Sequence, residues 1–321
     1  MASIRRLIIA SALVLLAGSA AAEFPDRPIR LLYGFPPGGS GDIIARLLAD
    51  RMAPDLGQRI VVENRTGANG ALAGDATAHS PADGHTVLLC STGNMTIAAE
   101  LPGARLPLDP ARDLMGLALV ARTTYGFVVP RGSRWNSVGE IVDAARKQPG
   151  QLSYASPGIG SVQHLSSEYF KQRMGLNIVH VPYRGSAPAI LDMLSGRTDF
   201  LITNLGDMMG QIRSGDLRLL ALGDPAGRRF FADVPFVSDT VPDFETDGWF
   251  ALCGPAGMTA PVTRRWQDAV RHALGDASLQ TKLLDNGLVA SFEDTEAVNV
   301  MFEASRRKFR AIIQAAGISV E

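Results

Sequence analysis

Short apolar runs alternate with amphipathic segments along most of this chain of 321 residues. The apolar runs have the length of buried strands, and the segments between them repeat apolar residues at helical spacing. The strands predicted in this way cover residues 29–35, 60–64, 86–90, 117–121, 126–130, 152–156, 178–183, 199–204, 217–223 and 249–254. The predicted helices cover residues 42–53, 137–147, 162–174, 187–195, 207–213, 262–274, 278–286 and 294–315. Such alternation predicts an α/β fold with parallel sheets covered by helices on both faces, and this number of strands favours two sheets over one.

The C-terminal part of the chain differs from the rest, because almost only helical spacing follows the apolar run at 249–254. A helix-rich segment that has no strands of its own must pack on an earlier domain. We therefore expect the chain to cross from one lobe to another near residue 123 and to return near residue 247. Lobe 1 then contains residues 24–122 and 247–321, and lobe 2 contains residues 123–246.

Three predicted strands are followed by a turn rich in glycine, proline or serine and then by a helix. These turns are residues 36–42 (PPGGSGD), 156–161 (SPGIGS) and 183–186 (YRGS). Pro188 follows the last of them near the first helical position, where proline is favoured. Backbone N–H groups at the start of a helix lie at the positive end of the helix dipole and attract anions. Ligands of open α/β sheets bind at the carboxyl ends of strands. If the turns belong to two sheets, they face one another across a cleft that suits a small anion.

Weaker polar signals follow other predicted strands. The Gly-rich segment 63–75 is either a wall of the same cleft, with Asn64 or Asn69 as hydrogen-bond donors, or a turn that needs glycine for positive φ. Residues 91–94 (STGN) and Asn204 also stand at the ends of predicted strands. Each of these positions alone is a weak indication of binding.

The chain lacks the motifs of the common catalytic and nucleotide-binding sites. The turn at 36–42 has neither the lysine of a phosphate loop nor the glycine spacing of a dinucleotide site. Ser161 and His164 have the spacing of a nucleophile and a base, but no GxSxG elbow is present, and a helix cap explains Ser161 better. None of the five histidines has a partner at zinc-site spacing, and His180, which alternates with valines, is interpreted as structural. We expect no catalytic residue, no metal and no cofactor.

The net charge of the chain argues against a nucleic-acid partner, and its N-terminus indicates a secreted protein. A formal net charge of −1 offers no basic field to phosphates, so we expect no nucleic-acid partner. Residues 1–22 have the basic start, the apolar run and the A-x-A site of a signal peptide, with cleavage after Ala22. The apolar run, residues 7–17, is shorter than the roughly 20 residues that cross a bilayer, which argues against a membrane anchor. The mature protein is expected in the periplasm, beginning at Glu23.

The chain has 2 cysteines, Cys90 and Cys253, which are too few for a disulfide-built scaffold. Both lie in apolar strand-like runs. A disulfide between them and a pair of buried free thiols are equally compatible with the sequence.

Taken together, these residues resemble the substrate-binding proteins of the tripartite tricarboxylate transporter family, also called the Bordetella uptake gene family. The resemblance runs from about residue 24 to residue 321 and is carried by six segments in the same order. These segments are FPDRPIRLLYGFPPGGSGDIIAR, GQRIVVENRTGANG, PADGHTVLL, LSYASPGIGSVQHL, VHVPYRGSAPAILDMLSGRTDF and WFALCGPAGMTAP. Any one of these matches is weak, but six in order are specific.

The resemblance implies a two-lobed fold of the type II periplasmic binding protein kind. Each lobe would be a mostly parallel sheet flanked by helices, and the lobes would close on a ligand about hinges near residues 121–126 and 245–249. Members of the family bind small carboxylates, namely di- and tricarboxylates, acidic amino acids and aromatic acids, and have no catalytic activity. The bound protein docks on the two unlike membrane subunits of a tripartite tricarboxylate-type transporter or, in some cases, on a sensor. We therefore expect a monomeric transport protein. A partner of a sensor kinase is the alternative, and a hydrolase using Ser161 and His164 is less favoured.

Carried over residue by residue, the resemblance also implies where the ligand binds. Backbone amides and ordered waters of the loops that correspond to residues 35–40 and 156–161 hold one carboxylate in the family. Residues 91–95 correspond to the variable part that selects the rest of the ligand, whereas the turn at 183–186 and Asn204 line lobe 2. The expected ligand-binding residues are Phe35, Pro37, Gly38, Gly39, Ser40, Asp42, Ser91, Thr92, Asn94, Ser156, Gly160, Ser161, His164, Tyr183, Arg184 and Asn204.

The chain departs from the family pattern at several places. Gly41 replaces a threonine, so that a hydroxyl donor is missing, and residues 64–70 (NRTGANG) differ from the usual N-x-P-G-A-G-G. Thr203 stands where the family often has an acidic residue. This loss of charge would favour a more acidic ligand or one without an amine, and Thr203→Asp would then weaken carboxylate binding. Arg184 is either a partner for a second carboxylate or an exposed turn residue, and exposure is the preferred interpretation.

Overall fold

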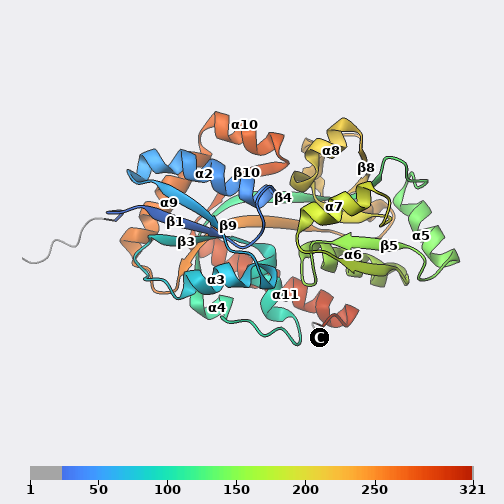
Figure 1. Ribbon diagram of the computed structural model, residues 1–321, viewed down its shortest axis with the longest axis horizontal. Coiled ribbons are helices and arrows are strands. Elements are labelled where there is room, and N and C mark those ends of the chain that lie inside the picture. Colours follow the sequence, from blue (N-terminus) through green and yellow to red (C-terminus); the bar gives the residue numbers. More distant parts are fainter. Residues whose placement is uncertain (1–23, 320–321) are drawn as a thin grey trace, which may run out of the picture.

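The computed structural model describes residues 24–319, which form two lobes connected by long strands (Figure 1). The predicted signal peptide, residues 1–22, and its cleavage site lie outside the described residues. Within the described part of the chain, no helix has both the length and the apolar character needed to cross a bilayer. The strands are β1 (Ile29–Tyr33), β2 (Ile60–Asn64), β3 (Thr86–Ser91), β4 (Leu114–Pro130), β5 (Ser153–Ser156), β6 (Val179–Pro182), β7 (Leu201–Asn204), β8 (Leu217–Leu222), β9 (Asp247–Pro255) and β10 (Leu288–Glu293). The helices are α2 (Ser40–Leu56), α3 (Ala71–Ala78), α4 (Pro110–Asp113), α5 (Val138–Lys147), α6 (Val162–Met174), α7 (Ser186–Leu194), α8 (Met209–Ser214), α9 (Ala260–Leu274), α10 (Ala277–Asp285) and α11 (Thr295–Ala316).

The first lobe, at the left of Figure 1, is built on a sheet with the strand order β10-β4-β9-β3-β1-β2. In this sheet β1 is parallel to β2 and β3, whereas the pairs β3–β9, β9–β4 and β4–β10 are antiparallel. The sheet is therefore mixed and not mostly parallel as expected. The reason is topological, because β4 carries the chain out of this lobe and β9 carries it back along the neighbouring position.

Strand β4 carries the chain from the first lobe into the second. The sequence predicted two strands at 117–121 and 126–130, but the structure has one strand of 17 residues, Leu114–Pro130. Its first part pairs with β9 as far as Thr124, and from Tyr125 onward it pairs with β7 and β8 of the second lobe. No turn-forming pair of residues interrupts the segment between the predicted strands, so the backbone stays extended across both lobes.

The second lobe, at the right of Figure 1, has β7 and β8 on the end of β4 and a separate parallel pair, β5–β6. Neighbouring residues of β4 face opposite sides of this lobe. Phe127 packs with Ile141 of α5 and Phe170 of α6, whereas Val128 packs with Met193 of α7. Both faces are thus covered by helices, as the alternation of strands and helices along the sequence predicted.

The first lobe has the same three-layer arrangement. Leu31 of β1 lies in a core with Trp266 of α9, and the adjacent Leu32 lies in a core with Phe302 of α11 on the opposite face. All four side chains are at most 2% exposed. Helices α2 and α9 therefore cover one face of the sheet, and α3 and α11 cover the other.

Three elements were not predicted from the sequence, namely β10, α3 and the short helix α4. The segment after 249–254 is not purely helical, because β10 forms an edge strand antiparallel to β4. Its residues are mostly half-buried, so they lack the apolar run by which the inner strands were found. Helix α3 begins inside the segment 63–75 that was interpreted as a loop, since the alanine-rich sequence ALAGDATA favours a helix despite its glycine.

Cys90 of β3 and Cys253 of β9 form a disulfide with a Cα–Cα distance of 6.0 Å. The two strands are adjacent, and Cys253 pairs with Leu88 in their register. Of the two states left open by the sequence, the structure therefore contains the disulfide. It joins the part of the first lobe that precedes the crossing to the strand that returns from the second lobe.

Candidate ligand-binding site

A cavity of about 110 Å³ lies between the two lobes, where the starts of three helices meet. One water needs roughly 10–15 Å³ by this kind of measure, so the cavity has room for a small molecule and not for a polymer. The first lobe contributes Tyr33, Phe35, Pro36, Pro37, Gly39, Ser40, Asn69, Ser91, Thr92, Gly93, Trp249 and Phe250, and β4 contributes Thr123 and Tyr125 at the crossing. The second lobe contributes Pro157, Ser161, Val162, Gln163, Gly185, Ser186, Ala187, Pro188, Asn204 and Asp207.

The loop before α2 is shaped by Asp42, which lies behind it. The Asp42 carboxylate accepts hydrogen bonds from Gly38 N at 3.2 Å, Asn64 Nδ2 at 3.0 Å and Arg46 Nε at 3.0 Å. Asn64 Nδ2 also donates to Phe35 O at 3.0 Å, which fixes the other end of the loop. Burial acts to raise the pKa of Asp42, but the hydrogen bonds from Arg46, Asn64 and Gly38 lower it, so the group is a carboxylate at neutral pH.

The missing hydroxyl at Gly41 has a steric explanation. A Cβ atom at Gly41 would lie 2.1 Å from the hydroxyl oxygen of Tyr33, which itself lines the cavity. A threonine could not occupy this position while Tyr33 keeps its place. The tyrosine hydroxyl therefore fills the space that a side chain at residue 41 would need.

The loop at 156–161 is held by serine and histidine side chains. Ser161 caps α6: its Oγ accepts from His164 N at 3.2 Å and donates to Gly158 O at 2.8 Å. His164 Nδ1 accepts from Gly160 N at 3.2 Å, and the imidazole stacks on His180 with ring centroids 4.2 Å apart. The Ser161 hydroxyl and the His164 ring thus bond to backbone groups of the loop and not to one another, which is the cap geometry and not that of a nucleophile and a base.

Both of these histidines are neutral at physiological pH. Burial, with a smaller contribution from the positive charge of Lys171, lowers the pKa of His164 to about 4. Burial and the neighbouring His164 lower the pKa of His180 to about 3, and His180 Nε2 bonds with Ser156 Oγ at 2.6 Å. The interpretation of His180 as a structural histidine agrees with this geometry.

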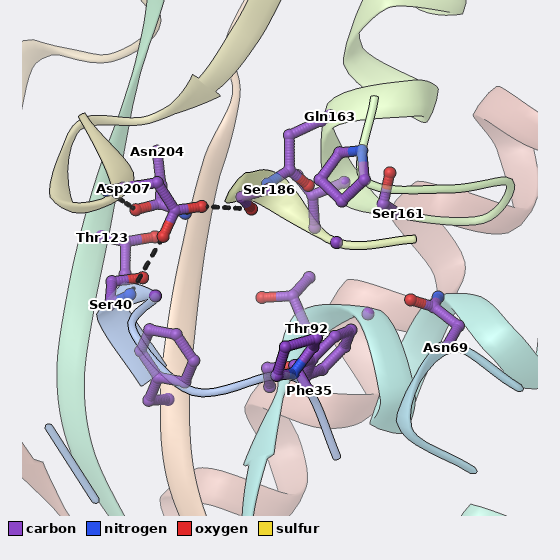
Figure 2. A pocket seen from close by; sticks show the side chains of 18 of the residues that line it. Phe35, Ser40, Asn69, Thr92, Thr123, Ser161, Gln163, Ser186, Asn204 and Asp207 are labelled. Atoms are coloured by element: carbon purple, nitrogen blue, oxygen red, sulfur yellow. Dashed lines mark hydrogen bonds between the residues drawn. The ribbon is translucent and has the colours of Figure 1, made fainter. Parts of the chain in front are cut away.

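Two hydrogen bonds connect opposite walls of the cavity. Asn69 Nδ2 of the first lobe donates to Gly160 O of the second at 2.9 Å. Ser40 N, in the first turn of α2, donates to Asp207 Oδ1 of the second lobe at 3.0 Å. The lobes are therefore in contact on both sides of the cavity, and Figure 2 shows Ser40 and Asp207 at one end of it and Asn69 and Ser161 at the other.

Half of the expected binding residues line the cavity. These are Phe35, Pro37, Gly39, Ser40, Ser91, Thr92, Ser161 and Asn204. The others do not line it: Gly38, Asp42, Asn94, Ser156, Gly160, His164, Tyr183 and Arg184.

Those that do not line the cavity mostly support the walls. Asn94 Oδ1 accepts from Ser91 N at 2.8 Å, and Tyr183 donates its hydroxyl to Asp192 at 2.8 Å. Arg184 is exposed, in agreement with its interpretation as an exposed turn residue. Sequence spacing places such residues near a loop but does not tell which side of the loop they face.

Several lining residues were missed. Thr123, Tyr125, Trp249 and Phe250 lie where β4 and β9 cross between the lobes, so the predicted crossing points near 123 and 247 were the available signal. Asp207 had no such signal. The sequence predicted a helix from residue 207 onward, whereas in the structure Asp207 ends a short helical turn that follows β7.

Thr203, proposed from the sequence as a place where the pocket has lost a charge, does not line the cavity. Its side chain is fully buried, and its hydroxyl accepts from Gln163 Nε2 at 3.3 Å. Gln163 lies between Thr203 and the cavity, and the acidic side chain of the pocket is that of Asp207. The side chain at position 203 therefore contacts Gln163 and not the cavity.

Residues 44–318 match the sequence profile of a known family, described as the tripartite tricarboxylate transporter family receptor. This chain belongs to that family. It is 32% identical over 315 residues to a protein encoded in the tcbD–tcbE intergenic region of Pseudomonas sp. strain P51, covering 96% of this chain and 93% of the other. It is 35% identical over 243 residues to protein BugT of Bordetella pertussis, covering 75% and 74%.

The fold is shared with a solved structure of R. palustris Rpa4515 with adipate. The TM-score is 0.88 at 30% identity, over 92% of this chain and 99% of the other. The predicted family and the two-lobed periplasmic binding protein fold are thus confirmed. The family is one of periplasmic solute-binding receptors and not of enzymes.

Proposed function

We propose that this receptor captures a small carboxylate between its two lobes in the periplasm and delivers it to a membrane transporter of the tripartite tricarboxylate type. One observation carries the proposal: the cavity between the lobes is lined by the first residues of α2, α6 and α7. Backbone N–H groups at helix starts bind anions without a cationic side chain. The adipate in the related R. palustris structure supports a carboxylate as the ligand.

The expected mechanism is closure around the ligand. A ligand that contacts both lobes binds the closed state better than the open one and so shifts the population toward closure. The apolar walls made by Phe35, Trp249 and Phe250 exclude water around the carbon skeleton, and hydrogen bonds from the cavity walls compensate the lost hydration of the carboxylate. A cavity between lobes that already contact one another suits a carrier that releases its ligand only when the lobes are opened.

We also propose the lobe limits of the sequence prediction, namely residues 24–122 with 247–321, and 123–246. The change of partners in β4 between Thr124 and Tyr125 and the start of β9 at Asp247 support them. The hinges would then be the short stretches of β4 and β9 at these points.

A thermal-shift screen of the chain from Glu23 onward tests the binding step. The protein is unfolded and refolded first, which removes any ligand that purified with it. The panel contains citrate, malate, succinate, adipate, aspartate, hexanoate and terephthalate, with 1-hexanol as the neutral control for hexanoate. An acid at a hundredfold excess over its Kd stabilises the folded state by about 2.7 kcal/mol.

A shift with one class of acid and none with hexanol is expected. If the refolded protein shows no shift with any acid, the proposed function is wrong. Uptake of the labelled acid by cells that contain or lack this protein then tests delivery, and equal uptake in both would contradict the transport role.

A further inference from the structure

Asp207 is the one charged side chain among the residues between 24 and 319 that line the cavity. Its carboxylate accepts three hydrogen bonds: Oδ1 from Ser40 N at 3.0 Å, and Oδ2 from Ser186 Oγ at 2.6 Å and Asn204 Nδ2 at 2.9 Å. Asn204 Oδ1 in turn accepts from Asp207 N at 3.1 Å and holds the turn in place. Among the ion pairs of the described chain, none involves Asp207, so its charge is not neutralised by a cationic side chain.

The carboxylate of Asp207 takes a position that a ligand carboxylate would otherwise use. Ser40 N belongs to the first turn of α2, whose N–H groups have no partner within the helix. The sequence predicted an anion site at this helix start. In the structure this site is occupied by a carboxylate of the protein itself, that of Asp207 from the opposite lobe. An anionic group of a ligand placed there would meet a like charge and donors that are already in use.

The charge of Asp207 acts on other walls of the cavity as well. The pKa values of Tyr33 and Tyr125, which both line the cavity, are raised first by burial and second by the charge of Asp207. The charge of Asp207 would likewise disfavour a negatively charged group of a ligand in the same space. A hydroxyl or ammonium group would instead be attracted, since a carboxylate can accept four hydrogen bonds and Asp207 has three.

The opposite end of the cavity has a different character. Figure 2 shows Asn69 and Ser161 there, away from Asp207, with Gln163 between the two ends. The start of α6 lies at this end, capped by Ser161, and the described residues that line it include no acidic side chain. The Ser161 hydroxyl and one N–H of the Asn69 amide are used there by Gly158 O and Gly160 O, so the donors that remain are the second amide N–H of Asn69 and the first backbone N–H groups of α6. The cavity is therefore polarised, with an acidic side chain at one end and only neutral donors at the other.

We infer that Asp207 sets the charge of the ligand: this receptor selects a compound with one carboxylate, held at the Ser161–Asn69 end, and a hydroxyl or ammonium donor facing Asp207. The inference rests on the proposed function and narrows it, because it makes dicarboxylates poor ligands. It is the reverse of the expectation drawn from Thr203, which does not line the cavity.

Length-matched acids test the inference on the refolded protein by calorimetry. One set is adipate, 6-hydroxyhexanoate and 6-aminohexanoate, and a shorter set is succinate, 4-hydroxybutyrate and 4-aminobutyrate. In the set of the length that fits, the hydroxy and amino acids are expected to bind roughly tenfold or more tightly than the dicarboxylate, by the repulsion between two like charges in a partly buried site.

The variant D207N removes the charge while its Oδ1 still accepts from Ser40 N. It is expected to bind the dicarboxylate roughly tenfold more tightly and the amino acid more weakly than the control D216N. Asp216 is exposed in the second lobe, outside the cavity, and D216N removes the same unit of charge.

The order of affinities in the unmodified protein decides the question even if D207N does not fold. A dicarboxylate that binds as tightly as its hydroxy and amino partners overturns the inference and leaves the proposed function standing. The same holds if D207N and D216N have equal affinity ratios. If no acid of either set or of the wider screen binds the refolded protein, the proposed function is overturned and this inference with it.

Discussion

His164 shows how a single side chain supports the ligand-binding loop without lining the cavity. Its neutral Nδ1 accepts from Gly160 N, and Gly160 O in turn accepts from Asn69 of the other lobe. A protonated imidazole has no acceptor nitrogen, so the loop depends on the neutral form of this ring. The His164 ring is also stacked on the ring of His180, and a positive charge on either imidazole would oppose protonation of the other.

This arrangement predicts a loss of stability on the acidic side. The pKa of His164 is about 4 in the folded protein, against an ordinary value near 6.5 in the unfolded chain. Between these values the unfolded state binds more protons, so the free energy of unfolding falls as the pH falls from 6.5 towards 4. The contribution of His164 amounts to at most roughly 3 kcal/mol.

Urea unfolding of the unmodified protein and of His164→Asn at pH 7, 6, 5 and 4 measures this contribution. Asparagine keeps an acceptor near the position of Nδ1 but does not titrate. The variant is expected to lose less stability over this range, with a residual slope from His180 and from acidic residues such as Asp42. Parallel curves for the two proteins would show that His164 does not control the acid response.

At the scale of elements, burial decides which strands can be predicted from the sequence. Inner strands such as β3, fully surrounded by apolar neighbours, were found with nearly correct ends, because continuous burial produces a continuous apolar run. The edge strand β10 was missed, since its half-exposed residues carry no such run. The two strands predicted at 117–121 and 126–130 both lie within β4. They form one continuous strand because β4 pairs with β9 in the first lobe and with β7 in the second, and these partners are distant in sequence.

The disulfide between β3 and β9 connects elements 163 residues apart. Its removal in a Cys90→Ala/Cys253→Ala double variant is expected to lower the free energy of unfolding by roughly 2–4 kcal/mol. Ligand affinity should change little, because neither cysteine lines the cavity and both strands keep their hydrogen-bonded neighbours. Urea unfolding of the oxidised protein, the reduced protein and the variant measures the effect, and equal stability of all three would contradict it.

At the scale of the whole molecule, two hydrogen bonds across the cavity hold the lobes together in the described structure. The hydrogen bond from Asn69 Nδ2 to Gly160 O exists only when the lobes are together, so its loss destabilises the closed state and not the separate lobes. Asn69→Gly removes the side chain and tolerates the positive φ of 52° at this position. One such hydrogen bond is worth roughly 0.5–1.5 kcal/mol, so the Kd is expected to rise by roughly twofold to twelvefold.

Calorimetry gives the affinity of Asn69→Gly, and small-angle X-ray scattering without ligand gives the share of open molecules, which is expected to increase. Asn136→Gly is the matched control, because Asn136 is exposed in the second lobe and its side chain bonds only to a nearby carbonyl, that of Arg134. If Asn69→Gly behaves like this control in both measurements, the hydrogen bond does not contribute to closure.

The sequence by itself determined the fold class, the family and the loops that meet at the cavity. These are carried by local patterns: apolar periodicity, the turns at 36–42 and 156–161, and the helix starts that follow them. Only the tertiary structure decided which side chains face the ligand space. Asp42 and His164 turn behind their loops because each finds hydrogen-bond partners there, whereas Asp207 reaches the start of α2 across the lobes, over 167 residues of sequence. Side-chain direction follows from partners brought together by folding, and a single sequence does not encode those distances in any local pattern.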